Sequence, residues 1–273
     1  MKAMPRGSDA VVIDLEDAVS RSRKADARKV TGQFLETVER QELGPSLWVR
    51  INAAYRSGDS LDEDLKAALR PSLDGLVLPK LNSTADVEAL AAALASYPRE
   101  SMPALIGMVE TAAGVQNISQ LAQTGLLSGI LMGEQDLSAD LGLALDFDGS
   151  LLEPLRLQAV VACAAAGLPG PIGSPQLIIH DAEELRRSSR RLGALGFSGR
   201  AVIHPEQIAV VNESFLPSSD EVQQARKVVD EFQAFDESGR GVHADQQDRM
   251  IDVAVVRRAR RTLARADRPA RHE

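Results

Sequence analysis

Short aliphatic runs alternate with longer helical patterns along almost the whole of this 273-residue chain. The runs are rich in Val, Ile and Leu, and they predict strands that are buried on both faces. Strands separated by helices pair in parallel, because each helix returns the chain to the start of the next strand. The predicted strands cover residues 10–14, 47–51, 75–78, 104–109, 129–132, 170–172 and 200–203.

Helical patterns fill the segments between these strands. Ser83 is a suitable N-cap and Pro205 a suitable first-turn residue. The predicted organisation is one barrel domain, residues 1–218, with a helical lid or oligomerisation extension of the same domain, residues 219–273. The predicted helices cover residues 21–42, 61–69, 83–96, 115–123, 151–166, 181–195, the segment from Pro205 and everything after 219.

Polar residues with useful chemistry follow nearly every predicted strand. An open doubly wound sheet gathers its site at one switch point, whereas a barrel gathers strand-end residues from the whole ring. The distributed pattern favours a (β/α)₈ TIM barrel. Seven strands are one short of eight, so the barrel apparently lacks its first strand, which we expect upstream of Met1 unless the barrel closes without it. The polar clusters are residues 14–17, Arg50 with Asn52, Lys80, Glu110, residues 133–136 and His204.

Composition argues against several classes of function. A net charge of −8 and only 3% aromatic residues disfavour a nucleic-acid or anionic-membrane partner. No apolar run is long enough to span a bilayer and no secretory pattern opens the chain, so we expect a cytoplasmic protein. The single cysteine, Cys163, lies among small residues and is expected to be a buried structural thiol.

Two acids at consecutive strand ends suggest a metal site. Glu110 directly follows the run 104–109, and Asp136 closes the segment after the run 129–132. Mg²⁺ typically takes one or two carboxylates and completes its shell with waters and substrate oxygens. Alternatively, each acid caps the helix that follows or pairs with a neighbouring cation.

Arg50 and an acidic triplet face the same predicted end of the sheet. The guanidinium of Arg50 can bind a substrate carboxylate at two points, or it can neutralise Glu110 or Asp17 across the barrel. Asp14, Glu16 and Asp17 place three acids within four residues. Such crowding implies a cation, a shared proton or a ligand nearby, unless some of the acids cap the next helix.

Lys80 and His204 are weaker candidates. Lys80 can attract a phosphate or carboxylate, or it can be a surface lysine. His204 precedes a proline at a predicted helix start, where a structural contact is the favoured interpretation over acid–base catalysis.

The chain resembles the citrate lyase beta-subunit-like proteins, within the wider group of HpcH/HpaI aldolases and malyl-CoA lyases. Any one matching motif is weak, but six in the same order are specific. The matching stretches are residues 8–19, 49–52, 77–80, 109–112, 133–137 with 140–142, and 196–205.

The resemblance implies a Mg²⁺-dependent carbon–carbon lyase. It would act on an acyl-CoA thioester of the citryl-, citramalyl- or malyl-CoA type and a 2-oxo acid, usually as a homotrimer. The implied metal ligands are Glu110 and Asp136, and the implied catalytic residues are Glu16, Asp17 and Arg50. Substrate binding is expected at Arg50, Lys80, Gly133 and Glu134.

Some positions depart from the family pattern. Gln135 stands where an acid is common, and Gly173 where relatives often carry Asp. Asp245 or Asp248 is expected to supply the acid that reaches a neighbouring subunit in malyl-CoA lyase-like relatives. A metal-dependent aldolase on free 2-oxo-4-hydroxy acids and a catalytically weakened barrel with a binding role are the alternative functions.

Overall fold

The computed structural model describes residues 7–39, 44–53, 61–97, 102–144, 149–236, 243–244 and 250–267. The chain divides into two compact units, one ending at Val211 and the other beginning at Asn212. Among the described residues, no helix combines the length and the apolar character needed to cross a bilayer. Asp245 and Asp248 lie outside the described residues.

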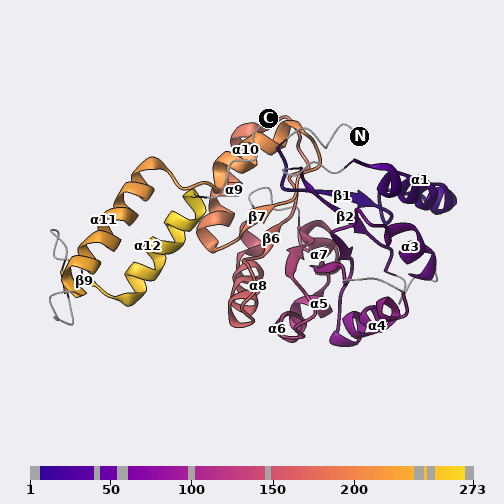
Figure 1. The fold of residues 1–273 in the computed structure, drawn as a ribbon, viewed down its shortest axis with the longest axis horizontal. Helices are drawn as coiled ribbons and strands as arrows, with labels where there is room; N and C mark the ends of the chain where they lie inside the picture. The colour runs from indigo at the N-terminus through magenta and orange to yellow at the C-terminus, as the bar shows by residue number, and fades with distance from the viewer. Residues whose placement is uncertain are drawn as a thin grey trace. The chain divides into compact units, whose positions relative to one another are not determined.

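The first unit is built on a seven-stranded sheet in which all strands are parallel and pair in chain order. The predicted parallel α/β sheet is therefore confirmed. Helices that follow the strands lie around the outer side of the sheet (Figure 1). The strands are β1 (Ala10–Asp14), β2 (Ser46–Arg50), β3 (Gly75–Leu78), β4 (Ala104–Val109), β5 (Gly129–Met132), β6 (Ile172–Gly173) and β7 (Gly199–Arg200).

The last two strands differ most from their predicted bounds. β6 begins after Pro171, because proline has no N–H to donate to a neighbouring strand. β7 ends at Arg200 rather than at Ile203. The N–H groups of Ile203 and His204 donate instead to the side-chain oxygen of Gln207, at 3.1 and 3.3 Å, so the backbone there leaves the sheet.

The helices of this unit follow the predicted order with three corrections. The helix predicted at 21–42 is a 3-10 turn followed by α1, which ends at Thr37 because Val38 has an extended backbone. The helix predicted at 115–123 is two short helices that meet at Asn117, whose Nδ2 donates to the carbonyl of Asn82 at 2.6 Å. α7, which carries Glu134 and Asp136, was not predicted. The helices are α1 (Lys24–Thr37), α3 (Leu61–Ala68), α4 (Thr84–Ala95), α5 (Ala112–Gln116), α6 (Ile118–Ala122), α7 (Glu134–Asp140), α8 (Glu153–Ala165) and α9 (Ala182–Leu195), with 3-10 turns η1 (Arg21–Arg23) and η2 (Ser150–Leu152). α10 (Glu206–Phe215) begins in this unit and ends in the second.

Strand periodicity separates the packed face of the sheet from the face that bears the site. In β2, Leu47 and Val49 are completely buried, whereas the intervening Trp48 and Arg50 are partly exposed. Successive side chains of a strand point to opposite faces, so Arg50 lies on the face away from the buried aliphatic layer. β1 is the least covered strand, with Val12 47% exposed.

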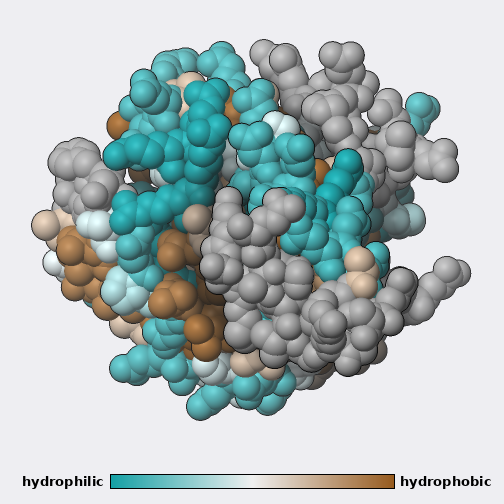
Figure 2. Space-filling model, turned by 90° about the vertical axis from the view of Figure 1, so that its left-hand side faces the viewer, coloured by the Kyte–Doolittle hydropathy of each residue, from teal (hydrophilic) through white to brown (hydrophobic). Residues whose placement is uncertain are grey.

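The second unit is mainly helical. α11 (Ser219–Asp236) and α12 (Val253–Ala266) pack against each other, and Asp252 caps α12 by accepting the N–H of Val255 at 2.9 Å. The prediction that everything after 219 is helical was wrong, because a short antiparallel pair, β8 (His243–Ala244) with β9 (Met250–Ile251), lies between these helices. Viewed from the side of α11 and α12, the surface is largely hydrophilic with hydrophobic areas among the polar ones (Figure 2).

We expect Gly75→Ala to destabilise the protein by about 1–3 kcal/mol, as other overpacking changes do. A Cβ on Gly75 would lie 2.2 Å from the Trp48 ring and 2.6 Å from the carbonyl oxygen of Ala104. Gly129→Ala is the matched control at the start of another strand, because its Cβ would meet nothing closer than 3.8 Å. Urea unfolding should show less than about 0.5 kcal/mol for the control, and equal losses in both variants would contradict the packing argument.

Candidate active site

Asp14 and Arg50 are register partners at the carboxyl ends of β1 and β2. The Nε of Arg50 donates to Asp14 Oδ1 at 2.9 Å and its Nη2 donates to Asp14 Oδ2. Its Nη1 lies 3.2 Å from Glu16 Oε2. The ion-pair partners of Arg50 are thus Asp14 and Glu16, not Glu110 or Asp17 as the alternative interpretation of the sequence had it.

This pairing keeps both groups charged. Burial by itself disfavours the charged forms, but the hydrogen bonds and charge of the partner outweigh it, so the pKa of Asp14 is lowered and the pKa of Arg50 is raised. Asp14 also accepts the N–H groups of Glu16, at 2.8 Å, and Ala18, at 3.2 Å. Asp14 therefore shapes the turn that carries Glu16 and Asp17.

Lys80 bridges the acidic turn and the end of β4. Its Nζ donates to Glu16 Oε1 at 2.5 Å and to Asp17 Oδ2 at 3.2 Å, and its backbone N–H donates to Glu110 Oε1 at 2.7 Å. Its φ of 53° lies in the left-handed region, which non-glycine residues rarely adopt unless their surroundings hold them there. Lys80 is therefore an integral part of this cluster.

Glu16 is nearly completely buried between two cations, Lys80 and Arg50. Burial raises the pKa of its carboxyl group, and the hydrogen bond from Lys80 and the charge of Arg50 only partly offset that effect. Asp17 is the more exposed acid of the turn, with 57% of its side chain accessible. The two acids thus occupy different environments within one turn.

Glu110 is 1% exposed and packs against the start of α7. A Cβ added to Gly133 would lie 2.6 Å from Glu110 Oε2, so only glycine permits this approach. Burial, together with the charges of Asp136 and Glu16, raises the pKa of Glu110 to about 8, although the Lys80 N–H opposes the rise. Asp136 stands exposed on the first turn of α7.

These two acids fit the requirements of a Mg²⁺ site. A buried carboxylate whose charged form is disfavoured by a second carboxylate gains from a divalent cation between them. Within the described ranges, no group of three or more His, Cys, Asp or Glu side chains is arranged to hold a metal. One or two carboxylates with waters and substrate oxygens is the arrangement typical of Mg²⁺.

Glu134 is buried and forms an ion pair, whereas Asp136 on the same helix is exposed. The two carboxylate oxygens of Glu134 accept Nε and Nη2 of Arg156, each at 2.7 Å, in a buried bidentate pair. Its N–H donates to Ser174 Oγ at 2.7 Å, and the Ser174 carbonyl accepts Nε of Arg200 at 2.8 Å. The sequence pattern gave no sign of Arg156, Ser174 and Arg200 as part of the site, because their partners lie far away along the chain.

His204 and Cys163 make contacts typical of structural residues. His204 accepts the N–H of Glu206 at its Nδ1, at 3.3 Å, and its ring lies edge-on to that of His180 with centroids 6.3 Å apart. Cys163 is buried, as predicted, and burial raises the pKa of its thiol to about 11. A thiol that stays protonated at neutral pH is a poor nucleophile.

The family described as HpcH/HpaI aldolase/citrate lyase has a sequence model that matches residues 1–205. The chain is similar to a (3S)-malyl-CoA thioesterase of Cereibacter sphaeroides, 31% identical over 266 residues that cover 97% of this chain and 89% of the relative. It is also similar to the mitochondrial citramalyl-CoA lyase of Homo sapiens, 31% identical over 274 residues, with 94% of this chain and 78% of the relative covered. Among solved structures, CitE from Mycobacterium tuberculosis in complex with magnesium, acetoacetate and coenzyme A matches with a TM-score of 0.76 and 31% identity, covering 95% of this chain and 90% of CitE.

The buried Glu110 should make the metal-free protein less stable as the pH rises. Because its folded-state pKa of about 8 is above the ordinary value of 4.5, the folded state holds the proton more tightly, and this stabilisation is lost as the pH rises from about 4.5 to about 8. Each tenfold difference in proton affinity corresponds to about 1.4 kcal/mol, so the loss can reach a few kcal/mol. Glu110→Gln in EDTA should remove this part of the pH dependence in urea unfolding; the same slope in both proteins would contradict it.

Proposed function

We propose that this protein, which belongs to the HpcH/HpaI aldolase/citrate lyase family, is a Mg²⁺-dependent carbon–carbon lyase that acts on a coenzyme A thioester. Its substrate would be a 3-hydroxyacyl-CoA of the malyl-, citramalyl- or citryl-CoA type, cleaved to a 2-oxo acid and an acyl-CoA. The names of the relatives include malyl-CoA and citramalyl-CoA, and the similar CitE structure contains magnesium, acetoacetate and coenzyme A.

One observation carries the proposal for this chain itself. The buried Glu110 and the exposed Asp136 follow neighbouring parallel strands, β4 and β5, and the charge of Asp136 acts on the Glu110 carboxyl group. Arg50 lies close enough to Glu110 for their charges to interact. This supports a cation-binding role for the two acids, beside a guanidinium that can bind a carboxylate.

Arg50 would hold the carboxylate of the 2-oxo acid portion. Asp14 occupies its Nε and one Nη2 hydrogen, which fixes the plane of the guanidinium. The substrate carboxylate would share the Nη1 side with Glu16, whose Oε2 lies 3.2 Å from Nη1. Lys80 would add positive charge beside Glu16 and Asp17. Gly133 and Glu134 would line the substrate site, with the Glu134 carboxylate engaged by Arg156 and the two N–H groups donating to the Val109 carbonyl and to Ser174 Oγ.

In the cleavage direction, the bond between the hydroxyl-bearing carbon and the carbon next to the thioester carbonyl breaks. Its electron pair stays on the thioester fragment as an enolate, and the hydroxyl-bearing carbon becomes the carbonyl of the 2-oxo acid. Glu16 or Asp17 accepts the hydroxyl proton and returns it to the enolate carbon. When bound, Mg²⁺ supplies Lewis-acid stabilisation of the charge that develops on the hydroxyl oxygen.

The finer architecture and the assembly belong to the same proposal. The seven-stranded sheet would form part of a (β/α)₈ barrel, residues 219–273 would act as a lid or oligomer arm, and the protein would be a cytoplasmic homotrimer. These points rest on the sequence pattern and the family resemblance. A sedimentation experiment that finds only single chains at micromolar concentration would contradict the trimer.

A second candidate is hydrolysis of the thioester. It is favoured by the 31% identity, over 97% of this chain, to a protein named (3S)-malyl-CoA thioesterase. The two reactions differ in their products, because hydrolysis releases the free coenzyme A thiol whereas cleavage of the carbon–carbon bond leaves the thioester intact.

The decisive experiment incubates the protein and Mg²⁺ separately with malyl-CoA, citramalyl-CoA, citryl-CoA and free 2-oxo-4-hydroxy acids, then measures the 2-oxo acid, the acyl-CoA and the free thiol. A lyase produces 2-oxo acid and acyl-CoA in equal amounts without thiol. Thiol release alone supports the thioesterase, and turnover restricted to free 2-oxo-4-hydroxy acids supports an aldolase. No turnover of any of these compounds would contradict an enzymatic role on this substrate class.

Asp136→Ala should abolish Mg²⁺ binding and lower turnover by at least about a hundredfold, because Lewis-acid stabilisation is worth several kcal/mol. The side chain is exposed, so the fold should stay intact. Titration calorimetry with MgCl₂, steady-state kinetics and circular dichroism check the three parts. Asp140→Ala, on the same helix, should lose no metal binding, although it removes a hydrogen bond to the N–H of Ala112. Unchanged metal binding in Asp136→Ala would refute the assignment.

A further inference from the structure

Lys24 is a buried lysine, the first residue of α1. It contacts the backbone of the turn that carries Glu16 and Asp17, which we call the acidic turn. Only 8% of the residue is exposed, and its Nζ donates to the carbonyls of Leu15, at 2.7 Å, and Glu16, at 2.8 Å. Its third partner is Asn52 Oδ1 at 2.5 Å. All three hydrogens of the ammonium group therefore have acceptors, which is what a lysine at this depth requires.

Asn52 continues the contacts into the next layer of the fold. Two residues beyond Arg50, it donates both its backbone N–H, at 2.7 Å, and its Nδ2, at 2.8 Å, to Asp64 Oδ2. Asp64 is 0% exposed and accepts Nε of Arg28 at its other oxygen, at 2.6 Å. We call the connected set Lys24, Asn52, Asp64 and Arg28 the buried polar chain.

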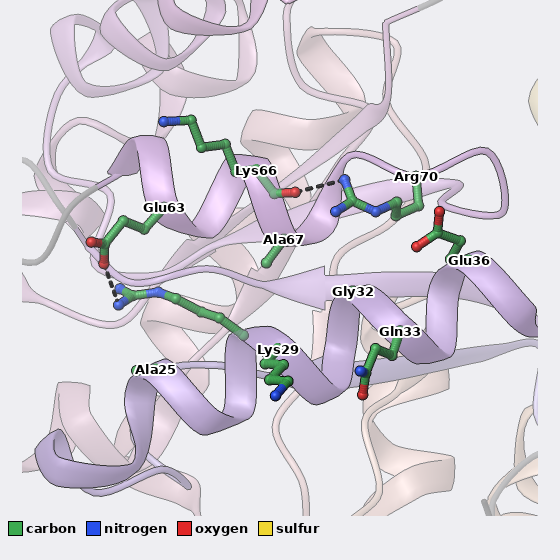
Figure 3. A pocket seen from close by; sticks show the side chains of 10 residues that line it. Ala25, Lys29, Gly32, Gln33, Glu36, Glu63, Lys66, Ala67 and Arg70 are labelled. Atoms are coloured by element: carbon green, nitrogen blue, oxygen red, sulfur yellow. Dashed lines mark hydrogen bonds and ion pairs between the residues drawn. The ribbon is translucent and has the colours of Figure 1, made fainter.

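The polar chain ends at a groove between α1 and α3. The groove has a volume of about 470 Å³, and residues of both helices line it, among them Lys29 of α1 and Glu63 of α3 (Figure 3). Arg28 also lines the groove, and its Nη1 donates to Glu63 Oε2 at 2.6 Å. Lys24 and Arg28 are four residues apart, so they lie on the same face of α1. The polar chain thus connects the acidic turn, the end of β2, α1 and α3 by an unbroken series of hydrogen bonds.

We propose that Lys24, Asn52 and Asp64 are positioning residues for Glu16 and Arg50, an inference that rests on the lyase function proposed above. Lys24 fixes the peptide groups on both sides of the Glu16 Cα, and Asp64 fixes the backbone and side chain of Asn52. The Glu16 carboxylate is held by Lys80 and Arg50. With main chain and side chain both restrained, Glu16 has one orientation toward the substrate.

Lys24 and Asp64 are themselves among the buried residues of α1 and α3, together with the aliphatic Leu35 and Leu65, which are 1% and 0% exposed. A buried ion network is weak support for stability, because desolvation opposes its Coulomb energy. Its effect here is on the geometry of the turn.

The test compares Lys24→Met and Asp64→Asn with the matched control Asp74→Asn. Asp74 accepts the N–H of Leu47 at 2.6 Å, at the amino end of β2, so its loss weakens a strand contact remote from the acidic turn. Both polar-chain variants should lower kcat about ten- to a hundredfold, as losses of supporting contacts around a site do. KM should change by less than about threefold, and the double variant should be non-additive in kcat.

Hydrogen exchange measured by mass spectrometry gives a readout that needs no turnover. Peptides covering residues 12–20 should exchange faster in Lys24→Met and Asp64→Asn but not in Asp74→Asn, although the melting temperatures of all three variants fall. Losses of kcat and protection no larger than in the control would overturn the proposal. If the wild-type protein cleaves no thioester, the lyase function fails, and the exchange of residues 12–20 still decides whether the polar chain holds the turn.

Discussion

The ion pair between Asp14 and Arg50 depends on parallel pairing in register, and the rest of the candidate site is arranged around it. The two residues end neighbouring strands, so their side chains meet without any adjustment of the loops. Asp14 simultaneously accepts two N–H groups of the turn that carries Glu16 and Asp17. The Asp14 carboxylate therefore sets the plane of the Arg50 guanidinium and the path of the acidic turn. A change in the register of β1 and β2 would move Asp14 away from Arg50.

Charge balance explains why so many acids can lie at one end of the sheet. Glu16 is neutralised by Lys80 and Arg50, and Glu134 is neutralised by Arg156. Glu110 accepts the backbone N–H of Lys80 and interacts with the Lys80 charge, but burial, together with the charges of Asp136 and Glu16, raises its pKa to about 8. A divalent cation would therefore be stabilised most strongly beside Glu110 and Asp136, whose negative charges are the least neutralised of this group. Lys80, with its left-handed backbone, contacts both Glu110 and Glu16: its N–H donates to Glu110 and its ammonium group donates to Glu16.

Most of the fold and the main candidate residues could be predicted from the sequence, whereas the partners of those residues could not. Strand periodicity located all seven strands, and the rule that parallel strands end at one edge brought Arg50, Glu110 and Asp136 together. The charge pairs were predicted less well, because a sequence shows that an arginine is near several acids but not which one it reaches. The polar chain through Lys24 and Asp64 gave no signal at all, since its members come from separate helices and a strand.

The sequence by itself determined the order of strands, the parallel sheet and the set of acids and bases at its carboxyl edge, because hydrophobic periodicity is a local property. Only the tertiary structure decided that Arg50 pairs with Asp14, that Glu134 is held by Arg156 and that Glu110 is buried beside Asp136. Those outcomes depend on distances and on exclusion of water between segments far apart in the chain. Burial and electrostatic interactions between distant segments arise only when the strands have come together. The charge state and the pairing of the site residues therefore depend on the folded structure.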